Sequence, residues 1–300
     1  MCSKKKTTNS TEATSEKVTK LLELINEADA VVIGAGAGLS TSAGLNYGGE
    51  RFQRLFSDYI ERYQLTDMYS AAFYEHKTEE ELWGYWCKHI YHNRYAAELD
   101  DTYKNLLELV SKKNFFVITT NGDHLFRLNN FPKDRLFYTQ GDYGLFQCAK
   151  GCHNKTYDNH ETIIEMIEKL DDLKIPTELI PHCPVCHGSM TVNLRKDSFF
   201  VEDDGWNQAL ARYEKFLKDN LQKKVLFLEL GVGFNTPTII KYPFMQMTYR
   251  NKNANYVCIN LSNITCPKEI ESQSLFISDN ISEIIQACVA QKTLHSDSVI

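Results

Sequence analysis

The chain lacks any apolar run long enough to cross a membrane, since none approaches the roughly eighteen residues that a transmembrane helix needs. It also lacks an excess of positive charge, with 33 Lys and Arg against 39 Asp and Glu and a formal net charge of −6. A basic face is the usual mark of a nucleic-acid-binding protein. The two absences predict a globular protein that acts on neither a membrane nor a nucleic acid.

The N-terminus lacks the apolar segment that follows the positive start of a signal peptide. Residues 1–14 are rich in Lys, Thr and Ser and are predicted to form a disordered tail. Without a signal peptide we expect the protein in the cytoplasm, where thiols stay reduced. Its nine cysteines are then predicted to lie in the core, bind a metal or react, and not to form disulfides.

Short apolar runs alternate with segments of helical periodicity along the chain. Most of these runs are continuously apolar, which is typical of strands in a parallel sheet that is covered on both faces. The alternation predicts an α/β fold with a Rossmann-like, doubly wound parallel sheet. The predicted strands are 29–33, 115–119, 135–139, 224–230, 255–261 and 274–278, and the predicted helices are 15–27, 51–63, 78–93, 100–112, 204–220 and 280–291.

Two regions interrupt this alternation. Residues 45–110 read as helical and rich in aromatic side chains, and residues 147–195 hold two pairs of cysteines. We predict that both are insertions into one nucleotide-binding domain and that together they form a smaller lobe. The aromatic residues are interpreted as the core of that lobe and not as a recognition surface. The nucleotide-binding domain would then comprise residues 15–44, 111–146 and 196–293.

The two cysteine pairs have the spacing of zinc ligands. Three residues separate Cys148 from Cys152, two separate Cys183 from Cys186, and thirty lie between the pairs. Such pairs offer two thiolates each to one tetrahedral ion, and four thiolates leave no open position, so the zinc would be structural and 147–195 a zinc ribbon. Two alternatives stay open: the pairs carry no metal, or a nearby histidine replaces one ligand. The candidate histidines are His153, His182 and His187.

A glycine-rich turn, GAGAGLSTSAG (34–44), follows a predicted strand and opens a predicted helix. Backbone N–H groups and a helix N-terminus in that setting can hold a diphosphate. The spacing is not GxGxxG, because Leu39 or Thr41 stands at the last position, and no Gly-Lys-Ser/Thr follows as in a P-loop. A turn that serves only close packing of strand and helix is the alternative.

Two predicted strands end on polar side chains. FFVITTNGDHLF (115–126) places Asn121 and Asp123 at its end, and RLFYTQGDYG (135–144) places Gln140 at its end. The alternative for the first is an Asx turn that merely ends the strand.

Together these motifs resemble the sirtuins, in matching order over roughly residues 15–290. In that family NAD lies across the carboxyl edge of the sheet, between the large domain and the zinc-bearing lobe. The matching segments are GAGLSTSAG (36–44), TTNGDH (119–124), Gln140-Gly141, the two cysteine pairs, LGVGFNTP (230–237) and INLSN (259–263).

The resemblance implies an NAD site made of three groups of residues. The glycine turn would hold the diphosphate, the two strand ends would hold the nicotinamide and its ribose, and the two later segments would hold the adenosine side. The implied residues are Ala35, Gly36, Ala37, Gly38, Leu39, Ser40 and Gly44, then Asn121, Asp123 and Gln140, then Gly231, Val232, Gly233, Asn260 and Leu261.

The chain departs from the sirtuin deacylases at the catalytic position. Those enzymes usually carry His-Gly where this chain has Gln140-Gly141. The family's histidine takes a proton from a ribose hydroxyl, whereas a glutamine amide has no titratable proton near neutral pH. His124 is the only nearby histidine that would replace it. The family's Ile-Pro-Asp-Phe-Arg loop is also changed, to LNYGG at 45–49.

Both departures resemble the microbial class M sirtuins, which are linked to macrodomain proteins. That branch implies NAD-dependent mono-ADP-ribosylation of a lipoylated, glycine-cleavage-H-like carrier protein, and a macrodomain hydrolase that removes the modification. A carboxylate acceptor is already ionised at pH 7 and needs no general base. Asn121 and Gln140 are therefore predicted as catalytic residues that position the reacting groups.

Two other functions stay open from the sequence. One is an NAD-dependent protein deacylase that uses an unrecognised base. The other is a non-catalytic interaction protein that binds NAD or ADP-ribose.

Overall fold

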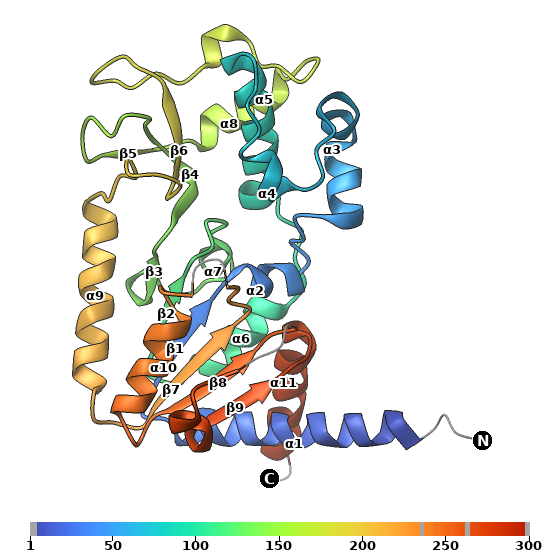
Figure 1. Cartoon of the computed structure of the whole chain (residues 1–300), viewed down its shortest axis with the longest axis vertical. Helices are drawn as coiled ribbons and strands as arrows, with labels where there is room; N and C mark the ends of the chain where they lie inside the picture. The colour runs from blue at the N-terminus through green and yellow to red at the C-terminus, as the bar shows by residue number, and fades with distance from the viewer. Residues whose placement is uncertain (1–4, 235–236, 262–264, 298–300) are drawn as a thin grey trace.

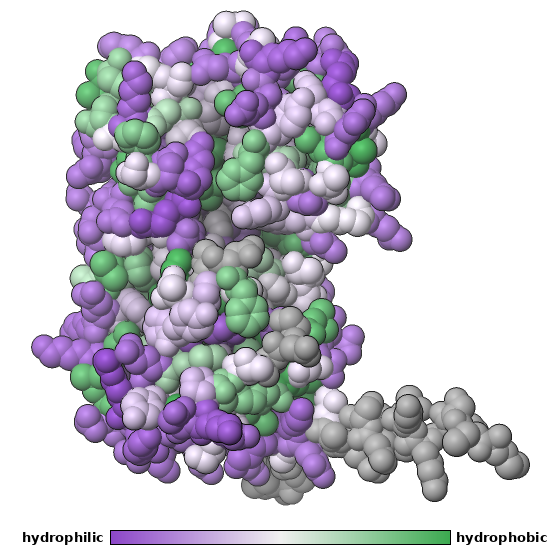
Figure 2. Space-filling model, in the orientation of Figure 1, coloured by the Kyte–Doolittle hydropathy of each residue, from purple (hydrophilic) through white to green (hydrophobic). Residues whose placement is uncertain are grey.

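The structure is a computed structural model that describes residues 5–234, 237–261 and 265–297. A large α/β domain carries a smaller lobe, which is drawn above it in Figure 1. The outline of the molecule narrows between the two parts in the space-filling view of Figure 2.

Six parallel strands form the sheet of the large domain, in the order β3-β2-β1-β7-β8-β9. Numbered within the domain, this is the 3-2-1-4-5-6 order of the Rossmann fold. The order reverses between β1 and β7, so a crevice is expected at the carboxyl ends of these two strands. All six predicted strands are confirmed to within two residues. They are β1 (Ala30–Ala35), β2 (Phe115–Thr119), β3 (Leu136–Tyr138), β7 (Val225–Leu230), β8 (Asn255–Ile259) and β9 (Ser274–Ile277).

Helices cover both faces of this sheet, as continuously apolar strands require. Val31 and Ile33 of β1 face one core, whereas Ala30 and Val32 face the other. None of the helices in the described ranges is long and apolar enough to span a membrane. One face carries α1 (Lys5–Glu27), α2 (Ala37–Ser42), α6 (Thr102–Val110), α7 (Leu125–Leu128) and α11 (Ile281–Asp297), and the other carries α9 (Asp204–Asn220), α10 (Lys241–Arg250) and the 3-10 helix η4 (Lys268–Gln273).

Helix α1 begins at Lys5, ten residues before the predicted start. The structure thus places residues 5–14 in a helix where a disordered tail was predicted, and residues 1–4 lie outside the described residues. Glycine and proline break helices, but the first glycine of the chain is Gly34 and the first proline is Pro132. Nothing in this stretch therefore stops a helix whose later turns are anchored on the core by Val18 and Leu21.

The smaller lobe has one core, built from both predicted insertions. Phe56 and Tyr85 from the first insertion share a buried cluster with Ile163 and Val192 from the second insertion. This confirms a smaller lobe made of a helical and a cysteine-bearing insertion. Its elements are α3 (Gly49–Tyr63), α4 (Met68–Ala71), α5 (Glu79–Ile90), the π-helix η1 (Tyr91–Tyr95), α8 (His160–Glu168), the 3-10 helix η3 (Thr177–Leu179) and the antiparallel strands β4 (Gly141–Cys148), β5 (Thr156–Asp158) and β6 (Met190–Leu194).

Two predicted domain boundaries are displaced in the structure. Tyr103 and Leu106 of α6 lie in the core of the large domain, so the helical insertion ends before residue 102 and not at 110. Tyr143 and Phe146 of β4 lie in the core of the lobe, so the second insertion begins near Gly141 and not at 147. An apolar stripe has the same periodicity whichever core it faces, which is why the sequence misplaced both limits.

Candidate functional site

The glycine turn after β1 lies against the end of β7, backbone to backbone. The N–H of Gly36 donates to the carbonyl of Leu230 at 3.0 Å, and the N–H of Gly38 donates to the carbonyl of Gly231 at 2.9 Å. A Cβ on Gly36 would lie 2.7 Å from the carbonyl oxygen of Gly231, whose own φ is +63°. Only glycines permit this approach, so the turn joins the two strand ends at which the sheet order reverses.

The turn offers few free backbone N–H groups, because those of Gly36, Gly38 and Leu39 are bonded within the protein. The side chain of Leu39 is fully buried in the core of the large domain. Gly44 lies at the far end of α2, with a φ of +102° and its N–H bonded to Thr41. Among the residues predicted at this turn, Gly36 and Ala37 line a cavity at the junction with the lobe.

Ser40, Asn121 and Asp123 form one hydrogen-bonded network. The Ser40 hydroxyl donates to Asp123 Oδ2 at 2.6 Å, and Asn121 Nδ2 donates to Ser40 Oγ and to the Gly36 carbonyl, both at 3.0 Å. Tyr103 Oη lies 2.9 Å from Ser40 Oγ. Because the Ser40 proton goes to Asp123, Tyr103 donates to Ser40. Ser40, Asn121 and Asp123 were thus predicted from the sequence, whereas Tyr103 was not.

This network determines what Asn121 can offer to a ligand. Both N–H groups of its amide are engaged, which leaves Oδ1 as the acceptor available at the cavity that Asn121 lines. Asp123 does not line that cavity and is only 2% exposed. Burial raises the pKa of Asp123 to about 6, against the lowering effect of the Ser40 hydrogen bond. Above that pH its carboxylate accepts from Ser40 and keeps the network in this orientation.

The cavity has a volume of about 470 Å³ and lies between the large domain and the lobe. Its two walls differ in character. The large-domain wall comprises Gly36, Ala37, Thr120, Asn121, Gln140 and Gly233, and the small-lobe wall includes Tyr47, Met68, Tyr69, Phe73, Trp86, His89 and Tyr143.

The aromatic residues of the lobe divide between core and cavity. Tyr59 and Trp83 are buried in the lobe core, as predicted. Tyr69 and Phe73 are each 60% exposed and line the cavity, so they do not belong to that core. The one-turn helix α4 buries Met68 and Ala71 in the core and leaves Tyr69 on its exposed side, and Phe73 follows the end of that helix.

Gln140 occupies the turn between β3 and β4, half-buried, on the cavity wall. Its carbonyl accepts from the N–H of Arg195 at 3.1 Å. The next residue, Gly141, has a φ of +98°, and a Cβ there would lie 1.9 Å from the carbonyl oxygen of Asn193. Backbone contacts with the segment after β6 therefore hold Gln140 at the cavity, close to the position that the sequence predicted.

His124, the histidine considered as a replacement base, does not line this cavity. Its Nδ1 lies 2.5 Å from Asp142 Oδ2, and its ring stacks on Tyr138 at 4.2 Å. Burial would raise the pKa of Asp142, but His124 and Arg94 outweigh it and lower that pKa to about 2. His124 belongs to a separate cavity of about 430 Å³ beside α9, so the structure does not support it as a base at the predicted site.

His89 lines the cavity and was not predicted from the sequence. It lies on α5, is 1% exposed and contacts the rings of Tyr47, Trp86 and Tyr143. Burial, helped by the charge of Arg51, lowers the pKa of His89 to about 3. The imidazole is therefore neutral at physiological pH and too weakly basic to take up a proton there.

The residues predicted at the adenosine side meet beyond β7 and β8. Asn260 Nδ2 donates to the carbonyl of Val232 at 3.1 Å, and the N–H of Gly231 donates to that of Ile259 at 3.0 Å. Val232 is buried, whereas Leu261 is 75% exposed. The predicted segments 230–237 and 259–263 also include residues 235–236 and 262–263, which lie outside the described residues.

The four predicted metal ligands converge at one end of the lobe. The sulfur atoms of Cys148, Cys152, Cys183 and Cys186 all lie within 4.8 Å of one another. Two of the S···S distances are 3.6 Å, close to the roughly 3.8 Å edge of a tetrahedron with Zn–S bonds of about 2.3 Å. The cluster fits a structural zinc ion, which these four thiolates would hold without an open coordination position.

The three alternative histidine ligands lie outside that cluster. His153 is the nearest, with Nδ1 at 3.0 Å from Cys152 Sγ and Nε2 at 2.8 Å from Tyr157 Oη. It can thus bond a thiolate, while the group that fits a metal among the described residues contains only the four cysteines.

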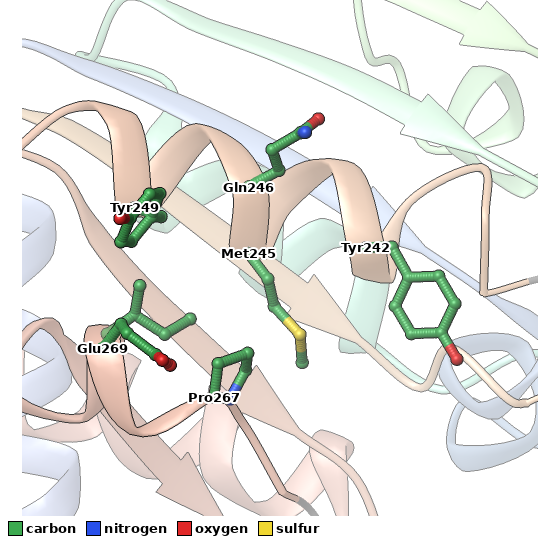
Figure 3. A pocket seen from close by; sticks show the side chains of 7 residues that line it. Tyr242, Met245, Gln246, Tyr249, Pro267 and Glu269 are labelled. Atoms are coloured by element: carbon green, nitrogen blue, oxygen red, sulfur yellow. The ribbon is translucent and has the colours of Figure 1, made fainter.

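A further cavity of about 360 Å³ lies between α10 and η4 (Figure 3). Tyr242, Met245, Tyr249 and Pro267 give it mainly apolar walls. None of the residues predicted to bind the cofactor lines it. It therefore has no part in the site between the lobes.

Two curated proteins resemble the chain over most of its length. It is 39% identical over 262 residues to "Protein ADP-ribosyltransferase" of Staphylococcus aureus (strain Mu50 / ATCC 700699), covering 87% of this chain and 83% of that protein. It is 31% identical over 242 residues to "Probable bifunctional ADP-ribose hydrolase/ADP-ribosyltransferase" of Fusarium oxysporum f. sp. cubense, covering 76% of this chain and 40% of that protein. No protein-family profile matches the chain.

Solved sirtuin structures share the fold. Sir2Tm bound to a propionylated peptide superposes with a TM-score of 0.60 at 20% identity, covering 92% of this chain and 99% of that one. A Sir2 mutant in complex with a p53 peptide and NAD superposes with a TM-score of 0.60 at 19% identity, with the same coverage.

Proposed function

Since the chain belongs to the protein ADP-ribosyltransferases with the sirtuin fold, we propose that it transfers ADP-ribose from NAD to a lipoylated, glycine-cleavage-H-like carrier protein. The cavity between the lobes is the proposed reaction site, with Asn121 and Gln140 as its catalytic residues. The acceptor is a carboxylate of the carrier.

The observation that carries this proposal is that no histidine with an ordinary pKa lines the cavity among the described residues. Gln140 stands where the sirtuin deacylases carry histidine, and the histidine that does line the cavity, His89, has a pKa of about 3. A reaction that needs a base to remove a proton from a ribose hydroxyl is therefore not supported by these two residues. A carboxylate acceptor arrives ionised at pH 7 and avoids that step.

The bond changes balance without any proton transfer. The bond between the ribose C1′ and the nicotinamide nitrogen breaks, and its electron pair neutralises the pyridinium. A bond from the acceptor carboxylate oxygen to C1′ forms. The protein groups position and stabilise: Asn121 Oδ1 accepts from ribose or nicotinamide donors, and the Gln140 amide orients the ribose hydroxyls.

The name of the Fusarium relative joins an ADP-ribose hydrolase to an ADP-ribosyltransferase, and this chain covers 40% of that longer protein. This supports our proposal that a macrodomain-type hydrolase removes the modification. We also propose a reducing, cytoplasmic setting. Four thiolates would hold the zinc, and none of the cysteines among the described residues forms a disulfide.

The test compares Asn121→Ala and Gln140→Ala with the unaltered protein. Each variant is incubated with the lipoylated carrier and NAD labelled in its adenylate part, and label on the carrier is measured. Removing one positioning or stabilising group typically costs on the order of 100-fold or more in rate. We expect losses of that size with the circular-dichroism spectrum unchanged.

Gln246→Ala is the matched control, because this glutamine lines the separate cavity beside α10. It is expected to transfer at the normal rate. Full transfer by both site variants would refute the assigned roles, and acyl release from an acyl-lysine peptide without labelling of the carrier would favour a deacylase.

A further inference from the structure

The hydrogen bonds around His89 determine which ring nitrogen carries its proton. The Tyr85 hydroxyl donates to the carbonyl of Met68 at 2.8 Å, and the same oxygen lies 3.2 Å from His89 Nδ1. A phenol has one proton to donate, so in this contact Tyr85 is the acceptor and His89 Nδ1–H is the donor. In the neutral ring, Nε2 is then left with a lone pair and no hydrogen.

Nε2 of His89 has no hydrogen-bond partner among the described residues, although it is buried. The ring centroid lies 5.6, 5.2 and 5.0 Å from those of Tyr47, Trp86 and Tyr143, all in edge-on contacts. These three rings line the same cavity as His89. A buried acceptor without a donor is destabilising, and a ligand that supplies the donor removes that penalty.

We propose that His89 is a specificity residue whose Nε2 accepts a hydrogen bond from a neutral amide N–H of the ligand in the aromatic end of the cavity. The site would accept a flat or apolar group that carries one such donor. At this aromatic end of the cavity a carboxylate is disfavoured, because its oxygens would face the lone pair of His89 Nε2. A cation is disfavoured by Arg195 and Lys196, which line the same cavity.

Two amides fit this chemistry. One is the carboxamide of nicotinamide, the leaving group of NAD. The other is the amide that joins a lipoyl arm to lysine on the carrier, and this source rests on the proposed function. The probes below distinguish the two.

The experiment measures binding to the full chain by calorimetry with nicotinamide, with nicotinic acid and with a lipoyl-lysine peptide, each in the presence of ADP-ribose. His89→Phe keeps a ring but removes the acceptor, whereas His89→Gln keeps an acceptor in a similar place. We expect His89→Phe to weaken one of the two amide probes by about tenfold, the usual cost of an unmade buried hydrogen bond. We expect His89→Gln to restore most of that affinity.

Which probe loses affinity in His89→Phe identifies the amide that His89 binds. Weakened nicotinamide binding, with lost preference over nicotinic acid, assigns the cofactor amide, and weakened peptide binding alone assigns the carrier amide. Unchanged binding of both amides in His89→Phe, or no binding of either to the unaltered protein, overturns the proposal.

A measurement on the unaltered protein covers the case in which the variants do not fold. Nitrogen-15 NMR of the histidines at neutral pH should show His89 protonated at Nδ1 only, and a proton on Nε2 would overturn the proposal. The labelled-NAD assay reports separately on the proposed function, so a protein that binds the amide without modifying the carrier would refute that function and leave the role of His89 standing.

Discussion

The two walls of the cavity between the large domain and the lobe differ in composition: one is a hydrogen-bonded polar network and the other is aromatic. On the large domain, polar groups bond one another: Tyr103 donates to Ser40, Ser40 to Asp123, and Asn121 to Ser40 and Gly36. On the lobe, aromatic rings surround a neutral histidine whose Nε2 has no partner within the described chain.

The difference separates two tasks. A preorganised polar wall stabilises charge that develops during a reaction, because its dipoles need no rearrangement. An aromatic wall with one open acceptor selects a ligand by shape and by a single donor. The first wall follows the motifs that resemble those of the sirtuins, and the second was found only in the structure.

Removing zinc should have the largest effect on transfer, because it should disrupt the lobe that forms the aromatic wall and leave the large domain folded. Cys183 is fully buried in the lobe core, so Cys183→Ser or a strong chelator should loosen that core and lower transfer by about 100-fold or more. Hydrogen exchange should rise in β4 and β6 and stay slow in β1 and β7. Cys288→Ser, in the core of the large domain, should keep the zinc. Normal transfer by protein shown to be zinc-free would contradict the dependence.

Gly36→Ala should damage the polar wall. The new Cβ would lie 2.7 Å from the Gly231 carbonyl oxygen, and we expect a loss of about 2–3 kcal/mol in unfolding free energy together with weaker NAD binding. Gly233→Ala is the control for stability, since a Cβ there meets nothing within 4 Å. Denaturant unfolding compares the two variants, and NAD titration compares Gly36→Ala with the unaltered protein. Equal stability of the two variants would show that the contact with β7 is not required.

The pH dependence should report on Asp123, whose pKa is raised from 3.8 to about 6 by burial. As the pH falls through 6, protonation replaces the charged acceptor of Ser40 by a neutral carboxyl with a hydrogen of its own, and we expect transfer to fall about tenfold by pH 5. Because the folded pKa exceeds the unfolded one, the native state holds the proton more tightly, and this group's contribution to stability is lost as pH rises from about 4 to about 6.

Asp123→Asn should abolish the fall in transfer below pH 6 and the change in stability between about pH 4 and pH 6. Relative to this variant, the unaltered protein should lose up to about 3 kcal/mol of unfolding free energy across that interval. Stability curves at several pH values, run on both proteins, make the comparison. If transfer falls equally at low pH in the unaltered protein and in Asp123→Asn, a group other than Asp123 causes the pH dependence.

The smallest expected effect is the change that Gln140→His makes to deacylation. This substitution restores the residue of the sirtuin deacylases, but Tyr47 remains bonded to Tyr143 at 2.8 Å in place of that family's loop. We expect acyl-lysine peptides to be deacylated no faster than by the unaltered protein, as measured by nicotinamide release. Deacylation at a rate typical of sirtuins would show that this one residue decides the reaction.

Patterns that are local in sequence predicted most of the large domain and the zinc cluster. Six continuously apolar runs gave six strands, and the spacing of Cys148, Cys152, Cys183 and Cys186 gave one cluster. The polar strand ends were identifiable because parallel strands bring their carboxyl ends to one edge. Local patterns could not predict where α1 begins or which of the two cores α6 packs against, because periodicity does not say which core a helix meets.

The sequence by itself determined the sheet, the glycine turn, the zinc ligands and three members of the polar network, since each depends on spacing along the chain or on strand ends that must meet. Only the tertiary structure decided the aromatic wall. Tyr47, His89 and Tyr143 come from segments far apart in sequence, and His89 has the spacing of an ordinary core residue on α5. Its neutral state and open Nε2 arise from the rings and charges that packing of the lobe brings around it, and no pattern within one segment encodes those neighbours.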